Sequence, residues 1–136
     1  MRVDSEPSHM SKVMVVDDAQ ADLKMIQAIL TTAGHDVVVY GDADAIAERM
    51  TTERPDILLL DIVMPRRNGY EVLRTVKKDE RLRHTPVVLV SCRNEDSDRV
   101  WGERQGADGY VAKPFTGAEL LNVITRVTAA RRPPPA

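Results

Sequence analysis

Cysteine is almost absent from this sequence, because Cys92 is the only one among 136 residues. An internal disulfide is therefore excluded, and the low content is typical of proteins from a reducing compartment. Cys92 itself is expected to be a small packed residue. No apolar run approaches the roughly 20 residues that cross a membrane, and the N-terminus lacks the apolar core of a secretory signal. We therefore expect a cytoplasmic protein with no membrane insertion.

Neither positive nor negative charge is in large excess. The formal net charge is −2, and the sequence contains no long run of lysine or arginine. A surface that binds nucleic acid normally carries a basic patch, so direct binding of nucleic acid is not expected. The length fits one domain, for which we assign residues 12–130. Residues 1–11 are polar and lack periodicity, which predicts a disordered lead-in, and residues 131–136 form a proline-rich tail.

Short apolar runs predict five buried strands. They are Lys12–Val16, Val37–Tyr40, Ile57–Leu60, Pro86–Val90 and Ala107–Ala112. Between and after these runs, apolar residues recur at spacings of three and four, as they do in amphipathic helices. Alternating strands and helices predict an α/β fold with a parallel sheet, right-handed crossovers and helices on both faces.

Several residues are expected to cap the predicted helices. Asp42 is the expected N-cap of the second helix. Asn68 with Glu71, and Thr116 with Glu119, have the spacing of capping boxes at the starts of the third and last helices.

Polar side chains follow the ends of four predicted strands. They are Asp17 and Asp18 after the first, Asp61 after the third, Ser91 after the fourth and Lys113 after the fifth. Parallel strands bring these ends to one edge, where ligands bind in open α/β sheets. Clustered carboxylates raise one another's pKa unless a cation is present, and oxygen ligands suit Mg²⁺. An aspartate, a lysine, a hydroxyl and a cation together are what phosphoryl transfer needs.

These residues carry a family resemblance. The motifs are Val16-Asp17-Asp18, Asp61-Ile62-Val63-Met64-Pro65, Ser91 and Lys113-Pro114. In order and separation they resemble the signature of CheY-like receiver domains of bacterial two-component response regulators. The resemblance covers about residues 12–127 and implies a flavodoxin-like (βα)5 fold with strand order 2-1-3-4-5. The stretch Val100–Ala107 further resembles PilH-type regulators of twitching motility.

The resemblance implies a phosphoacceptor and a metal site. Asp61 would accept a phosphoryl group from a histidine kinase or its phosphotransfer domain. Asp18, Asp61 and the carbonyl of Val63 would bind Mg²⁺, with Asp17 acting mainly through water. Such a domain is not an enzyme in its own right, although it assists its own phosphorylation and dephosphorylation.

The resemblance also implies how the signal is transmitted. Lys113, before an expected cis peptide bond, would pair with phosphoryl oxygens, and Ser91 would hydrogen-bond to the phosphoryl group. Tyr110 would then turn inward as an aromatic switch. A downstream protein partner would read the surface formed by residues 94–105, 108–112 and 116–127. The domain would be a monomer or a phosphorylation-dependent dimer.

Alternative interpretations remain. The chain could be the receiver fragment of a larger transcriptional regulator. A pseudo-receiver binding module would have lost an acidic, hydroxyl or lysine position, and none is lost. A magnesium phosphohydrolase would need a second acid two residues after Asp61, where Val63 stands. In the family, the positions of Val63 and Arg93 influence how long the phosphoryl group survives, and no lifetime follows from them here.

Overall fold

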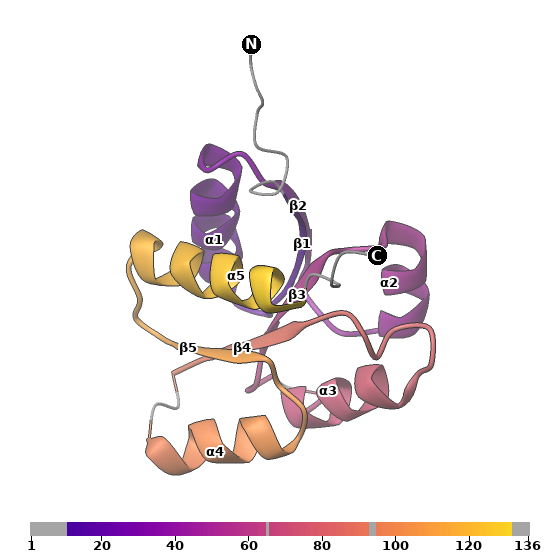
Figure 1. Cartoon of the computed structure of the whole chain (residues 1–136). Helices are drawn as coiled ribbons and strands as arrows, with labels where there is room; N and C mark the ends of the chain where they lie inside the picture. Colours follow the sequence, from indigo (N-terminus) through magenta and orange to yellow (C-terminus); the bar gives the residue numbers. More distant parts are fainter. Residues whose placement is uncertain (1–10, 65, 93–94, 132–136) are drawn as a thin grey trace.

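The computed structural model describes residues 11–64, 66–92 and 95–131, in which strands and helices alternate (Figure 1). The strands are β1 (Lys12–Val16), β2 (Asp36–Tyr40), β3 (Ile57–Asp61), β4 (Val87–Ser91) and β5 (Gly109–Ala112). The helices are α1 (Gln20–Thr32), α2 (Ile46–Glu53), α3 (Gly69–Lys78), α4 (Asp96–Arg104) and α5 (Gly117–Arg131). Neighbouring strands are parallel in the order β2-β1-β3-β4-β5, which confirms the predicted fold.

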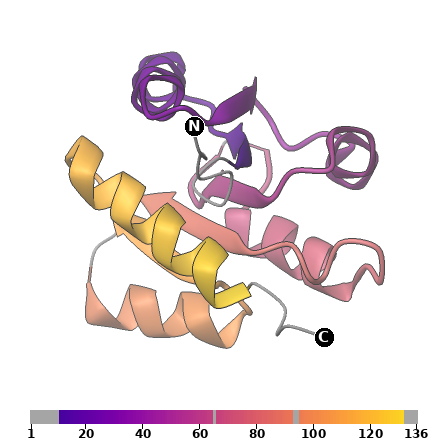
Figure 2. The ribbon, with the colours of Figure 1, turned by 45° about the horizontal axis from the view of Figure 1, so that its top comes forward.

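Helices cover both faces of the sheet (Figure 2). Successive strand residues point to opposite faces, so β1 and β3 each contribute to two separate buried clusters. One cluster packs the sheet against α2 and α3, and it includes Met14, Leu58 and Leu60. The other packs the sheet against α1 and α5, and it includes Val13 and Leu59. A strand buried on both faces gives the residues at its end a rigid base.

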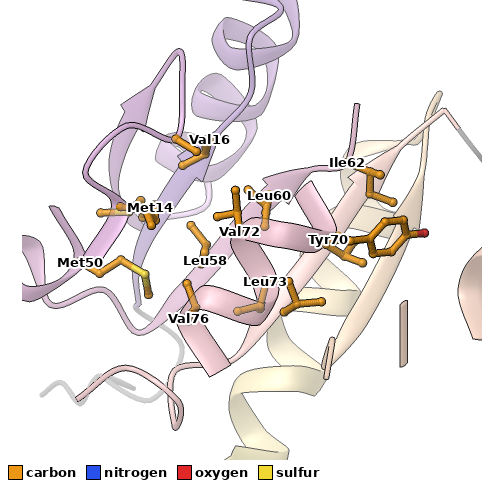
Figure 3. Packing of buried hydrophobic residues seen from close by; sticks show 14 of the residues in the cluster. Met14, Val16, Met50, Leu58, Leu60, Ile62, Tyr70, Val72, Leu73 and Val76 are labelled. Carbon is orange, nitrogen blue, oxygen red and sulfur yellow. The ribbon is translucent and has the colours of Figure 1, made fainter. Parts of the chain in front are cut away.

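The sheet packs against α3 through a group of buried apolar side chains (Figure 3). Apolar side chains of this contact are fully or almost fully buried, namely Val16, Leu58, Leu60, Ile62, Val72, Leu73 and Val76. Burying one such side chain contributes about 1.5–3 kcal/mol relative to leaving it exposed. The strand that carries Asp61 is therefore held firmly in place.

Two of the predicted helix starts are confirmed. The side chain of Asn68 caps α3 by accepting a hydrogen bond from the backbone N–H of Tyr70 at 2.8 Å, rather than from Glu71. At α5 the predicted capping box is present, because Thr116 N–H donates to Glu119 and Glu119 N–H donates to Thr116. These bonds satisfy backbone donors that have no partner inside the helix.

The prediction that Asp42 caps α2 is wrong. The N-cap position is Ala45, which has a left-handed backbone with φ of 49°. The Asp42 carboxylate instead accepts hydrogen bonds from the backbone N–H of Asp44 at 3.0 Å and from Arg49 at 2.9 Å. A short acidic side chain that closes its own turn competes with helix formation, so α2 begins later.

Gly102 has a packing role in α4. It is buried, and a Cβ at this position would lie 2.9 Å from Cδ1 of Leu89 and 3.6 Å from Cδ2 of Tyr110. Glycine therefore lets α4 approach β4 and β5 closely, which outweighs its unfavourable helix propensity.

The predicted lead-in and tail lie mostly outside the described residues. Ser11 belongs to the folded part, since its N–H donates to Nδ1 of His35 at 3.1 Å and its carbonyl accepts from Asp36. Within the described ranges, no helix is both long enough and apolar enough to span a membrane.

Candidate functional site

The carboxyl ends of the strands bring the predicted site residues to one edge of the sheet. Asp61 ends β3, where it is paired with Val90 of β4. Asp17 follows β1, and its N–H donates to the carbonyl of Tyr40 at 3.1 Å. Ser91 ends β4, and its carbonyl accepts from the backbone N–H of Lys113 at 2.8 Å. Backbone pairing of the sheet thus positions an acid, a hydroxyl and a lysine together.

Three of the carboxylates form a compact cluster. Asp17, Asp18 and Asp61 each offer an oxygen, and these oxygens lie within 4.8 Å of one another. Asp17 and Asp61 are buried, whereas Asp18 is exposed. The cluster therefore has a buried base and one side open to solvent.

Lys113 reaches into this cluster from the loop after β5. Its Nζ lies 2.9 Å from Oδ2 of Asp17 and 3.9 Å from Oδ1 of Asp61. Its shortest contact, at 2.7 Å, is with Oδ2 of Asp22. The peptide bond between Lys113 and Pro114 is cis, as predicted.

The surroundings of Asp61 strongly disfavour its charge. Burial, followed by the nearby charge of Asp17, raises its pKa to about 7. Lys113 and a hydrogen bond from the backbone N–H of Val63 act in the opposite direction but are outweighed. The cluster therefore needs more positive charge than Lys113 supplies.

Lys113 stays charged in these surroundings. Burial alone would lower the pKa of its ammonium group, but hydrogen bonds to Asp22 and Asp17 raise the pKa above its ordinary value. The ammonium group is thus a fixed positive charge beside Asp61.

Ser91 at the end of β4 and Tyr110 in the neighbouring strand β5 are in contact with each other. Ser91 is fully buried, and a side-chain hydrogen bond joins it to Tyr110. The Tyr110 ring, only 9% exposed, packs in the cluster on the α3 side of the sheet. The guanidinium carbon of Arg99 in α4 lies 5.1 Å from the ring centroid. In this structure the ring is already turned inward.

One sequence expectation differs from the geometry, and one residue of the site was missed. Cys92 is exposed rather than packed, because it lies just beyond the end of β4.

Asp22 was not predicted to belong to the site, although its contact with Lys113 is the shortest that this ammonium makes. The signal was its place in the first turn of the helix that follows the acidic loop, four residues after Asp18. Arg93 lies outside the described residues.

The residues at this edge fit a magnesium ion. Mg²⁺ prefers oxygen ligands, binds through one or two carboxylates and keeps several waters. Asp61 and Asp18 supply such ligands, and Val63 lies in the exposed loop that follows Asp61. A cation would also offset the repulsion that raises the pKa of Asp61.

The sheet order and this group of acids, lysine and hydroxyl define a CheY-like receiver domain. Residues 13–125 match the family described as response regulator receiver domain, and the chain belongs to this family.

Named relatives agree with this assignment. The chain is 37% identical over 123 residues to the protein PilH of Pseudomonas aeruginosa, a match that spans 88% of this chain and 99% of PilH. It is 31% identical to the alkaline phosphatase synthesis transcriptional regulatory protein PhoP of Bacillus subtilis, over 80% of this chain and 45% of PhoP. Among solved structures, chemotaxis protein CheY4 of Vibrio cholerae superposes with a TM-score of 0.80 at 28% identity, over 87% of this chain and 98% of CheY4.

Proposed function

We propose that Asp61 is the phosphoacceptor of this receiver domain and takes a phosphoryl group from a histidine kinase or its phosphotransfer domain. One observation carries the proposal: the buried Asp61 carboxylate lies in an acid cluster with the Lys113 ammonium 3.9 Å from its Oδ1. This arrangement supports the proposal, because a nucleophile, a metal-binding group and a positive charge would then act together on one phosphorus atom.

In the transfer, an Asp61 oxygen attacks phosphorus and the bond from phosphorus to the donor's imidazole nitrogen breaks. The nitrogen retains the electron pair of the broken bond and takes a proton from solvent. Lys113 would bind one phosphoryl oxygen, and the Ser91 hydroxyl would donate a hydrogen bond to another. Asp18, Asp61 and the Val63 carbonyl would hold Mg²⁺, which when bound would neutralise part of the charge on the phosphoryl oxygens. Asp17, buried beside Lys113, orients the ammonium group.

The output of the domain is proposed to be a change in the surface of α4, β5 and α5. A cavity of about 390 Å³ opens on this surface, and it is lined by Arg99, Tyr110, Phe115, Glu119 and Asn122 among others. Val100 and Trp101 of α4 are large apolar residues that are nevertheless exposed. Exposed apolar side chains on the helix that packs beside Tyr110 would suit a downstream protein partner, which a cytoplasmic monomer or a phosphorylation-dependent dimer would engage.

Intact mass spectrometry after incubation with acetyl phosphate and Mg²⁺ tests the proposal. We expect one phosphoryl group on the wild-type protein and none on Asp61→Asn. Asp44→Asn is a matched control, because this exposed aspartate lines the same pocket as Asp18 without belonging to the acid cluster. A phosphorylated product that persists in Asp61→Asn, or that forms equally well in excess chelator, would refute the proposal.

A further inference from the structure

The Lys113 ammonium is shared by three carboxylates from different parts of the chain. Asp22 of α1 lies at 2.7 Å, Asp17 after β1 at 2.9 Å, and Asp61 of β3 at 3.9 Å. Only the first two distances are short enough for a hydrogen bond, and both bonds are present. The ammonium is thus held on the α1 side of the cluster, away from the proposed phosphoacceptor.

Asp22 and Asp17 differ in how easily each can release Lys113. The Asp17 side chain is 2% exposed, and its other oxygen accepts a hydrogen bond from the N–H of Ala19 at 2.9 Å. The Asp22 side chain is 32% exposed, so water can replace the ammonium there. Leaving a buried charge unpaired is costly, whereas an exposed one is rehydrated. Asp22 is therefore the partner that Lys113 can leave at lower cost.

A helix-start role alone does not account for Asp22. An acid in the first turn of a helix is favoured by the helix dipole, and α1 has no side-chain cap of its own. That role requires only a negative charge near the first turn. The contact with Lys113 instead joins residues 91 positions apart in the sequence.

We propose that Asp22 is a positioning residue that competes with the phosphoryl group for Lys113 and so lowers the affinity of the site for phosphoryl-like anions. This inference rests on the proposed function, since it concerns how that same site is tuned. A lysine ammonium has three donors, and two of them already bind Asp22 and Asp17. One donor remains, but Nζ lies 3.9 Å from Oδ1 of Asp61. To bind an oxygen on phosphorylated Asp61 the ammonium therefore moves toward Asp61, and this movement weakens its contact with Asp22.

The test compares binding of beryllofluoride, a phosphoryl mimic, at saturating Mg²⁺ in the wild type and in Asp22→Asn. We expect about three- to fivefold tighter binding in Asp22→Asn, because a partly exposed ion pair that competes with the anion is removed. Mg²⁺ affinity, measured separately by calorimetry, should fall in the same variant, because a negative charge leaves the neighbourhood of the site. A purely structural role in starting α1 would not move the two affinities in opposite directions.

Three further variants make the test specific. Asp22→Glu keeps the charge and should return anion affinity toward the wild-type value. Asp44→Asn removes one charge near Asp18 without a contact to Lys113 and should change anion affinity less than Asp22→Asn. Asp22→Ser removes the charge with a small polar side chain, so it replaces Asp22→Asn if that variant does not fold.

The outcomes separate this inference from the proposed function. Unchanged or weaker anion binding in the charge-removing variants, or an equal gain in Asp44→Asn, would overturn the role of Asp22 while wild-type binding stands. A wild-type protein that neither binds beryllofluoride nor takes a phosphoryl group would overturn the proposed function itself.

Discussion

At the scale of single residues, the most unusual environment is that of Asp61. Its side chain is 8% exposed and faces other carboxylates, which together raise its pKa to about 7 in the protein without a cation. An unfolded chain exposes this group to water, where its pKa is near 3.8. The folded state therefore binds more protons than the unfolded state between these two values, and its stability depends on pH accordingly.

We predict that, in chelator, the free energy of unfolding of the wild type falls as pH rises from about 4 to about 7 relative to Asp61→Asn. The difference should reach about 1–2 kcal/mol above that window, since solvent screening at the loop edge reduces the full value. Urea denaturation of both proteins across this pH range measures it. A difference that stays constant with pH would contradict the environment assigned to Asp61.

Asp18 offers a second prediction at this scale. It is the exposed member of the acid cluster, and Lys113 does not neutralise it in any contact found among the described residues. We expect Asp18→Ala to weaken Mg²⁺ binding by at least about tenfold, because the ion loses one of two direct carboxylates. Calorimetric titration of Asp18→Ala and of Asp44→Asn with Mg²⁺ measures the two affinities. Equal Mg²⁺ affinities of the two variants would exclude Asp18 as a ligand.

The sequence predicted most residues of the candidate site but not Asp22. Asp17, Asp18, Asp61, Ser91 and Lys113 were predictable because each lies at or just beyond the end of a strand, and parallel strands end at one edge. Asp22 was not, because its contact with Lys113 depends on how the first turn of α1 packs beside the loop after β5. The local sequence shows only an acid in the first turn of the helix after the acidic loop, which does not by itself indicate a contact with Lys113.

At the scale of elements, the start of α3 is fitted directly against the end of β3. The N–H of Gly69 donates to the carbonyl of Ile62 at 2.7 Å. A Cβ at Gly69 would overlap the carbonyl oxygen of Asp61 and lie 2.6 Å from Cα of Ile62. Both are backbone atoms, which cannot rotate away as the end of a side chain can.

We therefore predict that Gly69→Ala destabilises the protein by about 2–3 kcal/mol, as overpacking of a close contact does. It should also slow phosphorylation, because relief of the overlap displaces the backbone that carries Asp61. Gly41→Ala is the control, since a Cβ there meets nothing within 4 Å, and this change should be neutral or stabilising by up to about 1 kcal/mol. Thermal unfolding of both variants measures the two changes in stability. Equal stability of the two variants would show that the backbone around Gly69 accommodates a Cβ without cost.

The elements themselves were largely predictable. The strands were evident as apolar runs because inner parallel strands such as β3 and β4 are buried on both faces. The edge strand β2 is only half-buried but is still an apolar run. The start of α2 was not evident, because the side chain of Asp42 can cap a helix or close a turn, and here it closes a turn with Asp44. Asn68 caps α3 as expected, but its carboxamide oxygen accepts from the N–H of Tyr70 rather than of Glu71, so the predicted capping box with Glu71 is not formed.

At the scale of the whole molecule, a series of contacts connects the site with α4. Ser91 is joined to Lys113 through the backbone and to Tyr110 through its side chain. The Tyr110 ring lies against Arg99 of α4. Next to it, Trp101 of α4 packs edge-on against Tyr70 at the start of α3, with ring centroids 6.3 Å apart. These contacts connect the site with α4 through Tyr110 and Arg99.

We predict that beryllofluoride with Mg²⁺ shifts amide resonances in β5, α4 and the start of α5 as well as in the loops around Asp61. A phosphoryl group carries about −1.5 to −2 charge and three acceptor oxygens, so it should draw the Ser91 hydroxyl away from Tyr110. A partner can read this change only if its affinity differs between the two states, so the change must reach the surface of these elements.

Tyr110→Phe is the matched variant for this experiment, because it keeps the buried ring and removes only the hydroxyl that is linked to Ser91. It should retain the amide shifts around Asp61 and lose most of those in α4, since the link from Ser91 is cut before the anion binds. Amide spectra of both proteins with and without the mimic measure this directly. Wild-type shifts confined to the loops around Asp61, or shifts in α4 that are unchanged in Tyr110→Phe, would show that Tyr110 does not transmit the signal.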